Sequence, residues 1–177
     1  MADYIFTVAS NEFKTKNNEE VSQVFQDLGF EESYVTSGGY VFVGSYGEGS
    51  LNDDMIVVKE KATGKVIGAY DTYNGMFSSL QEFLDNLPTI EDEDFDEMSV
   101  EDWEKNRLKE EDYSEIPLVD YLQDMLEDKE VFVLKEVGNE KLRYVGGCAT
   151  IIGKNFTEFV NLDYEIEKIV EAKGLEV

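Results

Sequence analysis

The fold class is decided by EVFVLKEVGNEKLRYVGGCATIIGKNFTEFVN, residues 130–161. Short apolar runs rich in β-branched residues and separated by turn residues are typical of strands. They predict three strands, at residues 130–137, 142–152 and 156–161. A helix is expected directly afterwards, at residues 164–172, with Asp163 as its N-cap and Gly174 as its stop. The end of the chain is therefore predicted to form a sheet followed by a helix.

The N-terminal part of the chain also mixes helix and strand. A helix is predicted before Gly29, capped by Asn17 or Asn18, because apolar residues recur at helical spacing at Val21, Val24, Phe25 and Leu28. Strands are predicted at residues 4–9, 39–43, 55–59 and 65–72. Residues 59–67 are expected to form a hairpin, with its turn at residues 61–64.

Two further helices are predicted in the middle of the chain. The first, at about residues 76–87, ends before Pro88. Its apolar residues lie on one side of the helix: Phe77, Leu80, Phe83, Leu84 and Leu87. The second, at about residues 117–127, begins with a proline in the first turn, where proline is favoured. Its apolar stripe is Leu118, Leu122, Met125 and Leu126. Both stripes indicate helices that pack on a core.

These elements predict an α+β protein with antiparallel strands and about four helices. The N-terminal half is β-rich, and a smaller C-terminal half is a helix, a sheet and a helix. The composition changes abruptly at residues 91–115, which hold 13 acids and three bases. We therefore expect an N-terminal subdomain at 1–90, an acidic linker or exposed helix at 91–115, and a C-terminal subdomain at 116–177.

The charge of the chain is strongly negative, with 40 acids against 15 bases and a formal net charge of −25. Apolar residues make up 42% and aromatic residues 12% of the chain, which is far more than a disordered acidic chain contains. The sequence therefore predicts a folded body that carries charge on its surface. Direct binding to nucleic acids or to anionic membranes is disfavoured, because both need basic groups.

The usual signals for location and catalysis are missing from the sequence. It has no secretory leader pattern and no apolar stretch of membrane-spanning length, which favours the cytoplasm. It has no histidine, so the commonest general base and metal ligand are missing. Cys148, the only cysteine, lies in an apolar strand and is expected to be a small buried hydrophobic residue. The sequence predicts neither a cofactor nor an enzymatic activity.

Two motifs resemble ligand loops but fail in detail. Residues 44–49 are rich in glycine, yet the full phosphate-loop pattern is not completed, so turn glycines explain them better. Asp92, Asp94 and Asp96 have the spacing that opens a calcium loop. The match ends there, because Glu97 stands where that loop needs glycine and Trp103 stands where it needs glutamate. No dedicated metal site is predicted.

The acid cluster itself is the candidate site. Residues 91–130 hold 18 acids and four bases, which is most of the net charge in a small part of the chain. Four of these acids are predicted to form a stripe on the helix at 117–127, and Trp103 or Tyr113 is a candidate aromatic anchor. The predicted partner-binding residues are Asp92, Asp94, Asp96, Glu101, Asp102, Trp103, Glu104, Glu111, Asp112, Asp120, Asp124, Glu127 and Asp128.

One stretch of the chain resembles known proteins. Residues 136–147, EVGNEKLRYVGG, with the later Ile151 and Ile152 and the triplet at 161–163, resemble small acidic proteins of unassigned function from phages, plasmids and conjugative elements of Gram-positive bacteria. Residues 11–17, NEFKTKN, are similar to their opening segment. The resemblance brings no catalytic residues. It implies a setting in which acidic proteins disarm host defence, as DNA-mimicking anti-restriction and anti-CRISPR proteins do.

Charge and resemblance together favour a non-enzymatic inhibitor. We expect it to occupy the basic DNA-binding or RNA-binding groove of a host defence nuclease, either a CRISPR effector or a restriction enzyme. An immunity protein or antitoxin that masks a basic toxin is an alternative that charge alone does not separate. A metal-dependent enzyme that uses only carboxylate ligands is a third. The oligomeric state is left open by the sequence.

Overall fold

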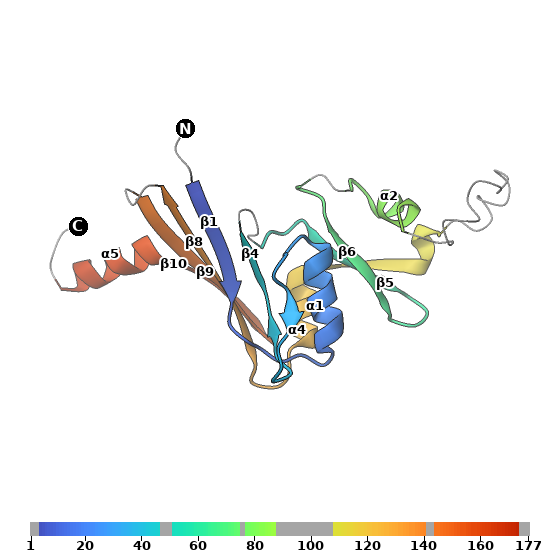
Figure 1. Cartoon of the computed structure of the whole chain (residues 1–177), viewed down its shortest axis with the longest axis horizontal. Helices are drawn as coiled ribbons and strands as arrows, with labels where there is room; N and C mark the ends of the chain where they lie inside the picture. The colour runs from blue at the N-terminus through green and yellow to red at the C-terminus, as the bar shows by residue number, and fades with distance from the viewer. Residues whose placement is uncertain (1–3, 47–50, 75–76, 88–107, 141–143, 174–177) are drawn as a thin grey trace.

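The structure of the protein is a computed structural model that describes residues 4–46, 51–74, 77–87, 108–140 and 144–173. It confirms the α+β class with antiparallel strands (Figure 1). Within the described residues there are four α-helices and ten strands, and the strands form three sheets. None of the helices in this part of the chain is long and apolar enough to cross a membrane.

The largest sheet has five strands in the order β10-β9-β8-β1-β4. Its members are β1 (Tyr4–Ser10), β4 (Gly44–Tyr46), β8 (Val131–Glu140), β9 (Tyr144–Gly153) and β10 (Phe156–Asn161). The strands predicted from residues 130–161 are confirmed, and β10 occupies the predicted residues. β1 pairs along β8 from Tyr4 opposite Glu140 to Ser10 opposite Leu134. The first strand of the chain therefore lies inside the sheet, next to a strand that comes more than a hundred residues later.

A second sheet of three strands has the order β6-β5-β7. The predicted hairpin is confirmed as β5 (Met55–Glu60) and β6 (Val66–Asp71), while β7 (Tyr113–Pro117) was not predicted. β7 has only two large apolar residues besides its proline, so it has little local signal, and its ladder with β5 is formed across more than fifty residues. A small pair of strands, β2 (Tyr34–Val35) and β3 (Val41–Phe42), completes the β structure.

The first two helices have the caps that their sequences favour. α1 (Asn18–Asp27) begins at Asn17, whose side chain accepts a hydrogen bond from the Glu20 N–H, and it ends before Gly29, which has a φ of 87°. α2 (Leu80–Asp85) is shorter than predicted. Ser79 caps it, and the Glu82 carboxylate accepts the Ser78 N–H, so the capping residues set a later start than the apolar pattern suggested.

The last two helices each correct a predicted boundary. α4 (Leu118–Met125) ends at Leu126, which has extended backbone angles, and so it stops before the predicted Glu127. α5 (Leu162–Ala172) is capped by Asn161, whose side chain accepts the Tyr164 N–H, so the prediction of Asp163 as the cap is wrong. Asn161 ends β10 in an extended conformation, which is the backbone geometry that an N-cap needs.

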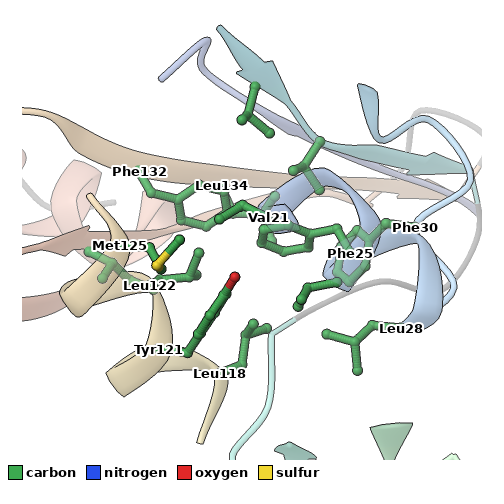
Figure 2. Close-up of a cluster of buried hydrophobic side chains, with 14 of the residues drawn as sticks. Val21, Phe25, Leu28, Phe30, Leu118, Tyr121, Leu122, Met125, Phe132 and Leu134 are labelled. Atoms are coloured by element: carbon green, nitrogen blue, oxygen red, sulfur yellow. The ribbon is translucent and has the colours of Figure 1, made fainter. Parts of the chain in front are cut away.

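The main core lies between the two larger sheets and encloses α1 and α4 (Figures 1 and 2). Phe132 of β8 packs edge-on against Phe13, with ring centres 4.9 Å apart, and stacks on Phe25 of α1 at 5.6 Å. The predicted stripe of α4 is buried, and Tyr121 on the same helix is buried with it. Residues from both ends of the sequence thus share one apolar interior.

A smaller core lies under α2, on the other face of the three-stranded sheet. It consists of Val58, Tyr70, Phe83, Leu84 and Tyr113. The subdomain boundaries expected at 90 and 116 stay a prediction: the first lies in residues 88–107, outside the described part of the chain, and the second lies within β7.

Candidate partner-binding surface

The predicted site residues fall into two groups. Asp92, Asp94, Asp96, Glu101, Asp102, Trp103 and Glu104 lie outside the described residues. The other six are all exposed, and they follow the chain from the 3-10 helix η2 (Glu110–Asp112) through β7 to α4 and the turn after it. The candidate surface that the structure describes is therefore the η2, β7 and α4 segment, residues 110–128.

Backbone contacts hold the start of this segment in place. The Lys61 N–H donates to the Asp112 carbonyl oxygen at 2.8 Å, and the Lys61 ammonium donates to the Glu111 carbonyl oxygen at 2.8 Å. These bonds tie η2 to the turn of the β5–β6 hairpin. They use the main-chain oxygens of Glu111 and Asp112, so the two carboxylates stay exposed to solvent.

A buried tyrosine orients the carboxylate of β7. Tyr70 is buried in the smaller core, where its ring stacks on Phe83 with centres 5.1 Å apart. Its hydroxyl donates a hydrogen bond to the exposed Glu115. Burial, followed by the hydrogen bond to Glu115, raises the pKa of Tyr70 far above its ordinary value. The ring is thus a fixed donor that positions an anionic side chain at the surface.

A second buried tyrosine does the same beside α4. The Tyr121 hydroxyl donates to Glu20 Oε1 of α1 at 2.9 Å, and the Lys59 ammonium lies 4.9 Å from the centre of the Tyr121 ring. Figure 2 shows the ring directed from α4 into the main core. Burial raises the pKa of Tyr121, and the negative charges of Glu20 and then Asp124 raise it further.

Tyr113 follows this pattern, and its burial corrects the prediction that it is an aromatic anchor for a partner. It is buried in the smaller core, and its pKa is raised by burial first and then by the charges of Glu60 and Asp112. A tyrosine beneath neighbouring acids recurs at Tyr70, Tyr113 and Tyr121. The sequence signal for this arrangement was the interleaving of acids with tyrosine in residues 110–121, but it does not tell which tyrosines are buried.

The acids of α4 do not form the single helical stripe that was predicted. Asp120 and Asp124 are one turn apart on the helix, whereas Glu127 and Asp128 lie in the turn beyond it. Asp124 pairs with Lys16 at 3.2 Å, and Asp128 pairs with Lys154. Exposed ion pairs of this kind contribute little stability, but they neutralise part of the local charge. No ion pair in the described part of the chain involves Asp120 or Glu127.

A shallow groove between α1 and β6 lies beside the Tyr121 bond. It is lined by Glu20, Gln23, Asp27 and apolar atoms of Val24 and Val66, together with two further β6 residues, Ile67 and Gly68. Gln23 donates to Asp27 at 2.9 Å, and partial burial raises the pKa of the Asp27 carboxyl. Two carboxylates above apolar walls fit a cationic side chain with an apolar stem, such as arginine.

The described residues outside this surface offer little reactive chemistry. Cys148 lies opposite Glu136 in the β8–β9 ladder and is half-buried, which is less than was expected. Burial and then the nearby Glu136 raise the pKa of the Cys148 thiol, so it stays protonated and is a poor nucleophile. No group of three or more acidic or thiol side chains suited to a metal ion occurs among the described residues.

Comparisons with protein-family models, with curated proteins and with solved structures find no match to this chain. The resemblance of residues 136–147 to acidic proteins of mobile elements stays a prediction. No functional residue is therefore transferred from a relative to this chain.

Proposed function

We propose that the protein is a non-enzymatic inhibitor that mimics nucleic acid and occupies the basic groove of a nucleic-acid-binding protein. The observation that carries this proposal is the set of exposed carboxylates on residues 110–128 beside the half-buried Glu20 of α1, with Glu115 and Glu20 oriented by buried tyrosine hydroxyls. The partner class that we propose is a defence nuclease in the cytoplasm of a host bacterium, which has to present such a groove to bind its substrate.

The spacing of the carboxylates supports mimicry. Asp120 and Asp124 are separated by about 6 Å along the helix axis, since an α-helix rises about 1.5 Å per residue. Phosphates on one strand of duplex DNA rise by about 3.4 Å per base pair before their helical path is counted. Arginine and lysine side chains bind carboxylate and phosphate oxygens alike, so a groove built for phosphates can accept this surface.

Orientation by tyrosine supports the proposal energetically. Glu115 and Glu20 accept hydrogen bonds from rings that are fixed in the two cores, so less side-chain freedom is lost when a partner binds. The groove beside Glu20 and Asp27 offers a place for a partner arginine. The net charge of −25 adds long-range attraction to a basic surface and repels nucleic acid itself.

The test is inhibition of purified nucleases, one CRISPR effector of the Cas9 type and one restriction enzyme, on a defined DNA substrate. We expect inhibition that saturates at a fixed ratio of inhibitor to nuclease, that excess DNA or heparin relieves, and that weakens steeply from about 50 to about 500 mM salt. Inhibition that is independent of both salt and competing DNA would contradict groove occupation. Catalytic destruction of the nuclease or its DNA would contradict a non-enzymatic role.

Two triple variants locate the surface. Glu111→Gln, Asp112→Asn and Asp120→Asn together remove three exposed charges from residues 110–124. Glu158→Gln, Glu167→Gln and Glu171→Gln remove three exposed charges from β10 and α5. The first triple variant should raise the inhibitory concentration at least about tenfold, and the control should change it far less. Equal losses would mean that diffuse charge, rather than this surface, drives inhibition.

A further inference from the structure

The groove between α1 and β6 combines apolar walls with two separated carboxylates. It encloses about 210 Å³ where α1 and β6 lie side by side (Figure 1). Its apolar walls include the buried Val24 of α1 and the half-buried Val66 and Ile67 of β6. Glu20 and Asp27, which are both half-buried, line it from α1. The groove is therefore an apolar hollow with an anionic group from each end of the helix.

The two carboxylates are too far apart to share one small cationic group. Seven residues separate Glu20 from Asp27, which places them on the same side of α1 and about 10 Å apart along its axis. Gln23 and Val24 lie between them. An ammonium group contacts carboxylate oxygens at about 2.8 Å, so a single one pairs with one end of the groove and leaves the other end free.

Neither carboxylate is neutralised by the chain itself. No ion pair within the described residues involves Glu20 or Asp27. Lys59 belongs to the neighbouring strand β5, but its ammonium lies over the Tyr121 ring, 4.9 Å from the ring centre. Partial burial raises the pKa of the Asp27 carboxyl, because the charged form has lost part of its hydration. A cation that enters the groove would offset that loss.

Hydrogen bonds hold both carboxylates in place. Glu20 Oε1 accepts the Tyr121 hydroxyl at 2.9 Å. Asp27 accepts the Gln23 side-chain amide at 2.9 Å and the backbone N–H of Ala69 on β6. A carboxylate has about four acceptor positions, so both groups keep capacity for a further donor. Because the acceptors are already fixed, less side-chain freedom is lost when a ligand binds.

A linear aliphatic diamine has the charge pattern that this groove lacks. An extended chain of four methylene groups holds its two nitrogens about 6 Å apart, since each bond is about 1.5 Å long. With hydrogen bonds of about 2.8 Å at both ends, the molecule reaches carboxylates roughly 10 to 12 Å apart. A cavity of about 150 Å³ takes up benzene, which has as many heavy atoms as this diamine, so the volume of the groove is sufficient.

We infer that the groove between α1 and β6 binds a linear aliphatic diamine, with one ammonium at Glu20 and the other at Asp27. The methylene chain lies against Val24, Val66 and Ile67, as the stems of long cationic side chains lie on apolar surfaces. An arginine from a partner brings one charge, so it pairs with one end only and competes with the diamine. The site does not depend on the proposed inhibitory function, because it needs only the two carboxylates and the apolar walls.

Isothermal titration calorimetry of the full chain with putrescine, the diamine with four methylene groups, tests the site at about pH 7 and about 50 mM salt. We expect one high-affinity site per chain, with a dissociation constant on the order of 0.1 mM. Butylamine has the same number of carbons and a single charge, and it should bind at least about tenfold more weakly. Equal affinity for the two amines would overturn the inference.

Matched variants separate this groove from the general acidity of the chain. Glu20→Gln with Asp27→Asn removes both charges and keeps oxygen acceptors for the tyrosine hydroxyl and the β6 N–H. It should weaken putrescine binding at least about tenfold. Glu158→Gln with Glu167→Gln removes two exposed charges from β10 and α5, and it should weaken binding less than about twofold. Equal weakening by both pairs would show that diffuse charge attracts the diamine, which would overturn the site.

A series of diamines tests the wild-type chain without any substitution. Affinity should be highest at about four or five methylene groups, because shorter diamines do not reach both carboxylates and longer ones have to bend. In NMR spectra, putrescine should shift the Ala69 amide, which donates to Asp27, more than the amides of β10. Affinity that does not depend on chain length, or that rises steadily with it, would contradict the inference, as would amide shifts centred away from α1 and β6.

Discussion

The first 130 residues and the remaining 47 residues differ in their net charge and in how far their apolar side chains are buried. The first part carries almost all of the net charge, and its large apolar side chains are buried with few exceptions among the described residues. The second part is close to neutral and leaves aliphatic and aromatic side chains exposed on β10 and α5. The charge of the second part is unevenly spread, because residues 156–173 hold five acids and two bases, whereas its other four bases lie outside β10 and α5.

This contrast makes salt a diagnostic variable. Attraction between the surface of residues 110–128 and a basic groove should weaken as salt is added, because salt screens exposed charges. The two parts also differ in three properties that variants can measure: their cooperativity in unfolding, the orientation of Glu20 by Tyr121, and the effect of the buried Glu136 carboxyl on stability.

The largest expected effect tests whether the two parts form one cooperative unit. Phe132 of the C-terminal part contacts Phe13 and Phe25 of the N-terminal part. Phe132→Ala should therefore lower the free energy of unfolding by about 3 to 5 kcal/mol and keep a single transition in urea. Ile169→Ala changes a side chain that is 61% exposed, so it should cost less than about 1 kcal/mol. Two separate transitions in the wild type would show that the parts unfold independently.

A smaller effect is expected where tyrosine orients a carboxylate. Tyr121→Phe removes the hydroxyl that donates to Glu20, and it should lower the free energy of unfolding by about 1 kcal/mol. The same variant should weaken nuclease inhibition, because Glu20 loses its fixed orientation. Tyr164→Phe, on the polar side of α5, is the matched control and should change neither quantity appreciably. If Tyr121→Phe inhibited the nuclease as strongly as the wild-type protein does, orientation of Glu20 would not contribute to binding.

The smallest effect concerns Glu136, a buried carboxyl in the near-neutral part. Burial raises its pKa above the ordinary value, although Cys148 donates a hydrogen bond that lowers it. As pH rises, the unfolded chain therefore loses this proton before the folded chain does. The stability that the protonated carboxyl provides is present below the ordinary pKa of glutamate and is lost as pH rises through the raised pKa of the folded state. Glu136→Gln should therefore raise the melting temperature at pH 7 relative to wild type.

Below the ordinary pKa of a glutamate, the advantage of Glu136→Gln should disappear, because the wild-type carboxyl is then neutral in both states. Glu158→Gln on β10 is the exposed control, and it should show no comparable change with pH. A variant at position 136 that is less stable than wild type at pH 7 would mean that the charged carboxylate has a favourable partner.

Local periodicity determined much of the secondary structure without help from the fold. The apolar spacing of α1 and its asparagine cap act within one or two turns; the structure contains the predicted helix and selects Asn17 from the two candidate caps. The strands of residues 130–161 are also confirmed, because their β-branched runs are bounded by turn residues. Net charge and the excess of acids in residues 91–130 are likewise properties of the sequence alone.

Other features depend on residues that are distant in the chain, and only the tertiary structure decided them. β7 exists as a strand because β5 supplies its hydrogen bonds, and Tyr121 meets Glu20 across 101 positions. Asp124 and Asp128 are paired because the fold brings Lys16 and Lys154 to them. The stripe of α5 has the same helical periodicity as that of α4, yet one is exposed and the other buried. Periodicity predicts that a helix has an apolar side, but burial depends on which elements the rest of the fold places against it.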